Sequence, residues 1–179
     1  MERVREFHGF SAPGVVLGGV MVAAAVNGLP PAILYDAICE TEKCLPDAVQ
    51  LLTPCTIGNG WLRIRSWGRF ALALYDKQTG EGIRAVLDTD RLEAFPEIKT
   101  WYYKLKPKEE TDPERLLAAI REAGADICRL QKIQIQPTLL AKEHRGKRII
   151  CPRCREAYPD NGNGYCPACL GGAGSVYRV

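Results

Sequence analysis

The residues with the most reactive side chains lie between Cys39 and Gly60. This stretch holds three of the eight cysteines together with several carboxylates. Cys44 directly precedes a predicted helix, where the helix dipole lowers the pKa of a thiol and favours the thiolate. Cys55 follows the other end of that helix. The residue types and their spacing therefore predict a polar pocket lined by thiols and carboxylates.

These side chains suggest specific roles. Cys44 and Cys55 are candidate nucleophiles, and His8 is a candidate base for either of them. The candidate pocket-lining residues carry carboxylate, amide or hydroxyl groups: Glu40, Asp47, Gln50 and Thr56. Each assignment has a structural alternative, because free cysteine is often a small core residue and a single histidine often has a purely structural role.

Short elements must position these residues. The apolar run 32–38 predicts a strand. Pro46 and Asp47 suit the first turn of a helix, since proline needs no hydrogen bond there and a negative charge favours the helix dipole. Apolar residues then recur at helical spacing, Pro54 ends the helix, and Gly58-Asn-Gly60 predicts a turn before the next strand.

Four groups in this stretch follow one another at characteristic gaps. They are Glu40, Cys44, Asp47-Ala-Val-Gln50 and Cys55-Thr-Ile-Gly-Asn-Gly60. Their order and spacing resemble the FmdE family, which is named after formylmethanofuran dehydrogenase. Relatives usually have glycine where this chain has Pro54, and lysine where it has Asn59. The resemblance extends from His8 to Cys169 and implies an altered or degenerate core site.

The N-terminal turn departs from the pattern of this family. Relatives usually read His-Gly-His-x-Cys-Pro-Gly, and this chain keeps His8, Gly9, Pro13 and Gly14. Phe10 and Ala12 replace the second histidine and the cysteine. If the family's site uses that cysteine as a ligand or nucleophile, this chain must work without it.

The remaining sequence predicts an α+β core, with helices packed on an antiparallel sheet. Ser11 is expected to cap an all-apolar buried helix over 14–26, for which a signal peptide is the alternative. Three strands are expected as an antiparallel meander, and a helix is expected over 111–124. The strands cover Trp61–Trp67, Phe70–Tyr75 and Gly82–Asp88.

An aromatic and basic segment spans 100–108. Such a mixture can bind nucleic acid by stacking, but it more often forms a surface strand or arm that packs on a partner. The net charge of +3 argues against an electrostatically driven nucleic-acid binder. We expect this segment to serve a homodimer contact, and we expect no membrane span.

The C-terminal region carries two Cys-x-x-Cys pairs separated by eleven residues. Four thiolates at this spacing predict one tetrahedral zinc ion, and a full set of four ligands indicates a structural metal. An iron site or two disulfides are the alternatives. The family resemblance implies a treble-clef zinc finger here. The predicted ligands are Cys151, Cys154, Cys166 and Cys169.

The sequence thus predicts a core domain over 1–140 and a zinc finger domain over 141–179, located in the cytoplasm. The resemblance implies an accessory protein of molybdenum or tungsten enzyme metabolism, related to methanogenesis, with the components of those enzymes as partners. Its core pocket would bind a small ligand or a second metal. The alternatives are a small cysteine-dependent enzyme, and a zinc-finger module that binds protein or nucleic acid. Whether the chain is an enzyme stays open.

Overall fold

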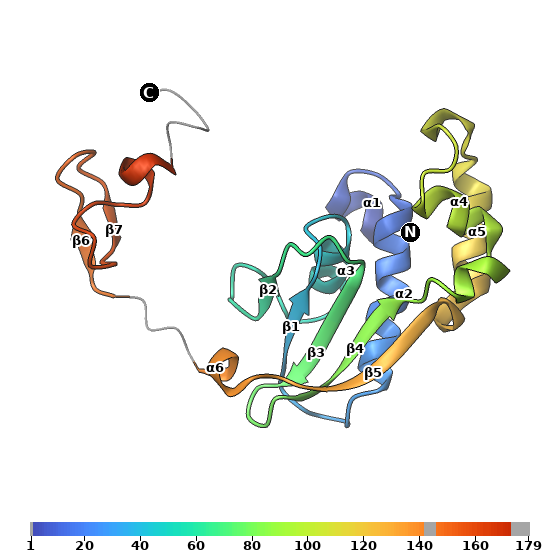
Figure 1. The fold of residues 1–179 in the computed structure, drawn as a ribbon, viewed down its shortest axis with the longest axis horizontal. Helices are drawn as coiled ribbons and strands as arrows, with labels where there is room; N and C mark the ends of the chain where they lie inside the picture. The colour runs from blue at the N-terminus through green and yellow to red at the C-terminus, as the bar shows by residue number, and fades with distance from the viewer. Residues whose placement is uncertain (1, 142–145, 173–179) are drawn as a thin grey trace. The chain divides into compact units, whose positions relative to one another are not determined.

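The computed structural model describes residues 2–141 and 146–172. The chain divides into two compact units, Met1–Leu140 and Ala141–Val179, which are described separately. The first unit is an α+β fold built on a mixed five-stranded sheet (Figure 1).

The sheet has the strand order β2-β1-β3-β4-β5. The β1–β3, β3–β4 and β4–β5 pairs are antiparallel, whereas β1 and β2 are parallel. The expected antiparallel meander is therefore wrong for its first strand, β2, which lies at the sheet edge and pairs in parallel with β1. Parallel pairing requires a crossover connection, and the helix α3 (Leu45–Leu52) lies in the connection between β1 and β2. The strands are β1 (Tyr35–Cys39), β2 (Leu62–Ile64), β3 (Ala71–Asp76), β4 (Glu81–Leu87) and β5 (Cys128–Gln134).

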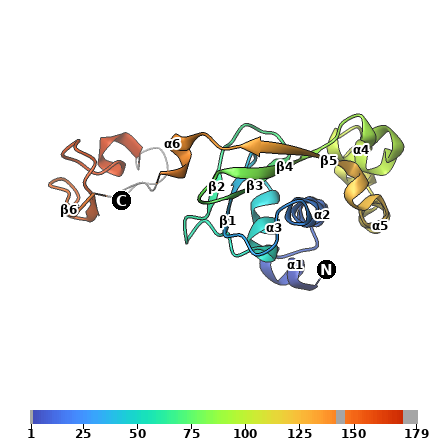
Figure 2. The same ribbon diagram turned by 90° about the horizontal axis from the view of Figure 1, so that it is seen from below.

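One face of the sheet is covered by helices. Figure 2 shows α1 (Glu2–His8), α2 (Pro13–Asn27) and α3 (Leu45–Leu52) on the same side of the strands. The helix α2 packs on both β4 and α3, and apolar residues of all these elements form the main core. The expected apolar helix is confirmed, but its N-cap is Ala12 without a side-chain hydrogen bond, so the expected Ser11 cap is wrong.

Small residues let α2 and α3 approach closely. A Cβ added to Gly18 would lie 2.8 Å from the Cβ of Ala48, and one added to Gly14 would lie 2.8 Å from the Sγ of Cys44. Both distances are far below van der Waals contact, so these two positions require glycine. The close approach places the start of α3 directly beside the start of α2.

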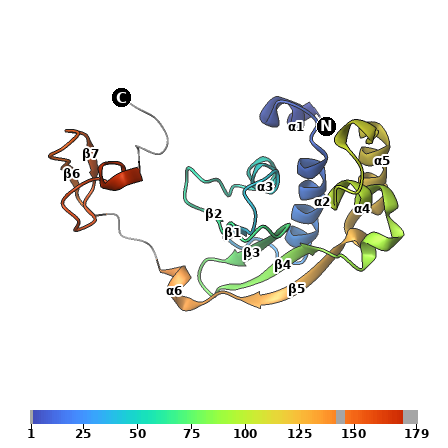
Figure 3. The ribbon, with the colours of Figure 1, turned by 45° about the horizontal axis from the view of Figure 1, so that its top comes forward.

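Two helices pack next to the N-terminal half of α2, α4 (Pro96–Tyr102) and α5 (Pro113–Ala123) (Figure 3). Asp112 caps α5 by accepting hydrogen bonds from the backbone of Glu114 and Arg115, so the helix expected over 111–124 is confirmed. The expected strand or arm over 100–108 is wrong, because its first residues belong to α4. Short 3₁₀ turns connect these helices: Arg91–Ala94, Lys108–Glu110 and Gly124–Ile127.

The other face of the sheet has a smaller apolar cluster. Ile38, Ala73, Tyr75 and Ile135 form it, and the short helix α6 (Pro137–Leu140) packs against it. Within the described residues no single helix is long and apolar enough to cross a bilayer; α1 and α2 together pass by length and composition, but they are bent by 117°.

The second unit contains a two-stranded antiparallel sheet and one helical turn. The strands are β6 (Arg148–Ile150) and β7 (Ala157–Pro159), and the turn is Ala168–Gly172. Tyr158 packs with Cys151 and Cys166 in a small cluster. Residues 142–145, near the start of this unit, lie outside the described part of the chain.

Candidate functional site

A cavity of about 820 Å³ opens beside Cys44 in the first unit. Its wall comes from the start of α2, the turn before α3, the end of α4 and the loop that follows α4. A volume of this size is typical of small-molecule sites. The lining residues are Gly14, Lys43, Cys44, Gly68, Phe70, Trp101, Tyr102, Lys104, Lys106, Pro107, Lys108 and Thr111.

Cys44 sits at the centre of a tight turn. Its φ is 58° and its ψ is −48°, and the backbone N–H of Leu45 donates to the carbonyl of Lys43 at 2.5 Å. This is a γ-turn with positive φ at the central residue, a conformation that is rare and strained for residues with a side chain. Strain of this kind is found at functional sites, and here it aims Cys44 at the cavity wall.

The sequence-based expectation of a low thiol pKa at Cys44 is wrong. Burial raises the pKa of this thiol, the charge of Asp47 raises it further, and the charge of Lys43 offsets only part of the increase. A raised pKa disfavours the thiolate, which weakens the proposal that Cys44 acts as a ready nucleophile.

His8 and Asp47 form a direct pair next to this turn. The Nδ1–H of His8 donates to Oδ2 of Asp47 at 2.5 Å, with side-chain exposures of 19% and 32%. Helix α1, which ends at His8, packs on α3, and Arg3 of α1 donates to the carbonyl of Leu51 at 2.8 Å. The ring of Phe10, which replaces the family's second histidine, packs on His8 with 5.0 Å between ring centroids.

Cys55 lies at the opposite end of α3, about 12 Å of helix away from Cys44. Its side chain is fully buried, and its Sγ–H donates to the carbonyl of Tyr35 at 3.4 Å. Burial raises the pKa of this thiol too. The structure thus places Asp47 close to both His8 and Cys44, although neither His8 nor Asp47 lines the cavity, and it does not bring Cys55 to them.

Glu40 is buried among cations. Its carboxylate accepts from Arg84 at 2.7 and 2.9 Å and pairs with Arg69 at 2.7 Å. Burial alone would raise the pKa of this carboxyl, but Arg84 and Arg69 outweigh burial and hold the pKa below its usual value. Arg84 lies directly opposite Ala73 on the neighbouring strand, so the two side chains share one face of the sheet. Ala73 belongs to the smaller apolar cluster, and the Glu40 ion pairs therefore lie on the sheet face opposite α1, α2 and α3.

Gln50 and Thr56 organise the loop after α3. The Oε1 of Gln50 accepts from the backbone of Ile57 at 3.2 Å, and Thr56 Oγ1 accepts from the backbone of Asn59 at 3.1 Å. In turn, the Oδ1 of Asn59 accepts a hydrogen bond from the backbone N–H of Thr56 at 3.0 Å. Neither Gln50 nor Thr56 lines the cavity beside Cys44.

Sequence reasoning misses most of the cavity wall. The aromatic and basic residues of 100–108 indicate a binding surface, but nothing in their pattern says what that surface contacts. In the structure Trp101, Tyr102 and three lysines of this segment face the chain's own cavity. The composition of the segment is therefore the signal that could have located the site.

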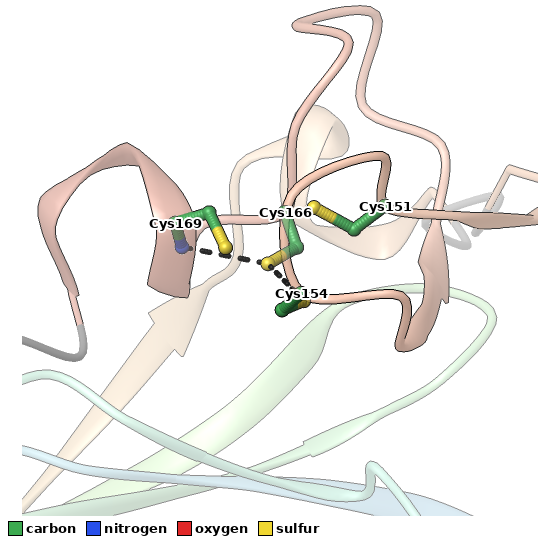
Figure 4. A group of neighbouring side chains, drawn as sticks. All are labelled: Cys151, Cys154, Cys166 and Cys169. Atoms are coloured by element: carbon green, nitrogen blue, oxygen red, sulfur yellow. Dashed lines mark hydrogen bonds between the residues drawn. The ribbon is translucent and has the colours of Figure 1, made fainter. Parts of the chain in front are cut away.

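The second unit holds a separate candidate metal centre (Figure 4). One ligand atom from each of Cys151, Cys154, Cys166 and Cys169 lies within 4.8 Å of the others. The Sγ atoms of Cys154 and Cys166 are 3.7 Å apart. Tetrahedral zinc with Zn–S bonds of about 2.3 Å would separate its sulfurs by about 3.8 Å.

Backbone amides support the thiolate form of one of these cysteines. Amides of Cys154 and Cys166 lower the pKa of Cys151 to about 6, whereas burial and the neighbouring thiols raise the pKa of Cys169 to about 12. The N–H of Cys169 also donates to Cys166 Sγ at 3.4 Å. The Sγ atoms of Cys154 and Cys166 are too far apart for a disulfide, whose S–S bond is about 2.05 Å. The donor set therefore fits zinc.

The chain is an α+β protein with a small C-terminal unit that carries a four-cysteine cluster. Residues 7–135 match the family described as FmdE, molybdenum formylmethanofuran dehydrogenase operon. The chain belongs to the FmdE family, as its sequence motifs indicate.

Two similar proteins extend this assignment. The crystal structure of a tungsten formylmethanofuran dehydrogenase FmdE-like protein from Syntrophus aciditrophicus is 53% identical, with a TM-score of 0.89 over 99% of this chain and 92% of that one. A probable S-adenosyl-L-methionine-binding protein from Archaeoglobus fulgidus is 28% identical over 99% of this chain. This chain spans 53% of the length of that relative.

Proposed function

We propose that this FmdE-family protein binds a small organic ligand beside Cys44 and acts as an accessory protein in molybdenum- or tungsten-dependent formylmethanofuran dehydrogenase-type metabolism. The observation that carries the proposal is the cavity of about 820 Å³ that reaches Cys44. The His8–Asp47 pair stands next to the same turn and fixes the orientation of the His8 ring.

A small molecule suits this cavity better than a second metal ion. Within residues 2–141 and 146–172, the four cysteines of the finger are the one group of three or more His, Cys, Asp or Glu side chains close enough to share an ion. The raised thiol pKa values at Cys44 and Cys55 also disfavour both metal ligation and nucleophilic attack at neutral pH.

In the finger, four thiolates would complete the coordination of one zinc ion and leave no open position. The role of that ion is structural: it would supply folding free energy to a unit whose apolar cluster is small.

The partners follow from the operon description of the family. Subunits of formylmethanofuran dehydrogenase are the proposed partners, a homodimer is the proposed assembly, and the cytoplasm is the proposed location. The finger would contribute by docking on protein rather than on nucleic acid, consistent with the chain's modest net charge of +3.

S-adenosylmethionine is a second candidate ligand, suggested by the relative from Archaeoglobus fulgidus. The aromatic residues Phe70, Trp101 and Tyr102 in the cavity wall support it, since an adenine ring stacks well on aromatic side chains. Its sulfonium cation is less well matched to the lysines of the same wall.

Mass spectrometry tests the proposal. The untreated chain should release a small organic molecule on denaturation, and Thr111→Trp, which fills the cavity, should release much less. Thr89→Trp, at an exposed site outside the cavity, should behave like the unmodified chain. Equal release from Thr111→Trp and the unmodified chain would refute the site.

Elemental analysis of the same samples separates the alternatives. One zinc ion per chain is expected, and Cys44→Ser should retain it. A second metal ion that disappears in Cys44→Ser would support a core metal site instead.

A further inference from the structure

The cavity beside Cys44 concentrates positive charge. Its wall contains Lys43, Lys104, Lys106 and Lys108. These four charges exceed the net charge of the entire chain, which is +3. Among the residues that the structure describes, none that lines the cavity carries a carboxylate. Four ammonium groups therefore share one cavity wall.

These lysines are not neutralised by the protein itself. In the described part of the chain, none of the four forms an ion pair with a carboxylate, whereas Lys77 pairs with Asp36 and Lys99 pairs with Glu93. Glu109 and Glu110 follow Lys108 in sequence, but they are exposed and lie outside the cavity wall. Like charges held around one hollow repel each other, and a bound anion would relieve this repulsion.

The same wall also carries aromatic side chains. Phe70 meets Tyr102 edge to face at 6.3 Å between ring centroids, and Trp101 lies 6.4 Å from Tyr102. These three side chains are only partly buried, so ring surface remains open to the cavity. Aromatic faces beside ammonium groups suit a ligand that has a planar ring and a negative charge.

The backbone after α4 keeps the lysines at the cavity. The N–H of Leu105 donates to the carbonyl of Thr100 at 2.9 Å, and Lys104 has a φ of 53°. This is a Schellman-type helix end, which reverses the chain direction just past the helix. Lys104 occupies a position where glycine is usual, so the turn places a cation at the cavity wall despite the conformational penalty.

We infer that the cavity beside Cys44 binds a planar ring that carries phosphate, with the ring against Trp101 and Tyr102 and the phosphate among Lys104, Lys106 and Lys108. The inference rests on the proposed function and specifies the class of ligand for that site. Lysine is suited to phosphate because its ammonium group is a compact point charge with three donors.

Calorimetric titrations with four kinds of probe separate the contributions of ring and charge. ADP carries both features, adenosine carries only the ring, inorganic phosphate carries only the charge, and S-adenosylmethionine combines the ring with a cation. We expect ADP to bind at least tenfold more tightly than adenosine or inorganic phosphate, and S-adenosylmethionine to bind more weakly than ADP. Binding of ADP should weaken as salt is added, because the lysines are exposed.

Two variants and a matched control locate the binding. Lys106→Glu should weaken ADP binding about tenfold or more, since it replaces an attraction by a repulsion. Lys132→Glu makes the same charge change at an exposed site on β5, outside the cavity, and should leave ADP affinity within about twofold of the unmodified chain. Trp101→Leu should weaken ADP and adenosine alike, and its melting temperature shows whether the fold survives.

The outcomes distinguish this inference from the proposed function. Equal affinity for ADP and adenosine, or equal effects of Lys106→Glu and Lys132→Glu, would overturn the phosphate assignment while leaving a ligand site in place. Tighter binding of S-adenosylmethionine than of ADP would overturn it in favour of a cationic ligand. Failure of all probes to bind would also overturn it, and the release experiment with Thr111→Trp would then decide separately whether the cavity holds a ligand.

Discussion

The thiol of Cys44 occupies the space that a side chain on Gly14 would need. A Cβ added to Gly14 would lie 2.8 Å from both the Cβ and the Sγ of Cys44. The starts of α2 and α3 therefore meet through a glycine on one side and the cysteine of the cavity wall on the other. This contact makes the position of Cys44 sensitive to a single methyl group on its neighbour.

Gly14→Ala should displace Cys44 and destabilise the core by about 1–3 kcal/mol, the usual range for overpacking. Urea denaturation measures the stability, and the rate of Cys44 labelling reports the displacement. Gly19→Ala on the same helix is the control: its added Cβ would meet Leu52 at an ordinary 3.4 Å. If both variants are equally stable, the close contact at Gly14 does not constrain the fold.

Asp47→Asn should lower the pKa of Cys44, because the charge of Asp47 is one of the causes that raise it. Lys43→Gln should change it in the opposite direction, since the charge of Lys43 lowers it. The pH dependence of iodoacetamide labelling, read on the Cys44 peptide by mass spectrometry, measures both. If the midpoint of the labelling curve is the same in both variants as in the unmodified chain, the charges of Asp47 and Lys43 do not affect the pKa of Cys44.

Glu40→Gln should destabilise the core by about 3–5 kcal/mol, the typical effect of removing one partner from a buried ion pair. The loss leaves Arg84 and Arg69 without their carboxylate. Glu97→Gln, which breaks the exposed pair with Arg115, should change stability by at most about 1 kcal/mol. Thermal or urea unfolding at pH 7 makes the comparison.

The Glu40 pair should also make stability depend on pH in the acid range. Because the folded state lowers the pKa of Glu40, its stabilisation is complete above the pKa of the unfolded chain and is lost as pH falls through the lower folded value. The stability curve of Glu40→Gln should therefore be flatter below about pH 4.5 than that of the unmodified chain. Parallel curves would mean that other carboxylates dominate.

Chelation of zinc should unfold the second unit and leave the first intact. Protease digestion after treatment with a chelator should then cleave within 146–172 while the core remains resistant, since four-cysteine units depend on the metal to fold. Cys154→Ser should behave like the chelated protein. Cys128→Ser, which changes a buried core cysteine outside the cluster, should keep its zinc.

Local sequence signals predict the elements that depend on local chemistry. Pro46 and Asp47 lie in the first turn of α3, and the apolar run 14–26 lies within α2; both are readable from residue type and position. The pairing of β2 is not readable, because parallel pairing with β1 depends on where α3 carries the chain. Such long-range topology has no signature within the strand itself.

The sequence identifies candidate residues of the site, but it does not predict which of them lie close together or how their pKa values shift. The closeness of His8 and Asp47, 39 positions apart, arises because α1 packs on α3. The pKa of Cys44 depends on burial and on Asp47, and the helix-dipole argument alone gives the opposite sign. Cys55 has the spacing expected of a site residue, but its thiol is buried and donates to the carbonyl of Tyr35.

The γ-turn at Cys44 has a consequence for variants made at that position. Glycine there would relax the backbone, whereas alanine would retain the torsional penalty of about 1–3 kcal/mol while also removing the sulfur. Comparing the folding free energies of these two replacements would measure the torsional cost of the γ-turn in the wall of the cavity.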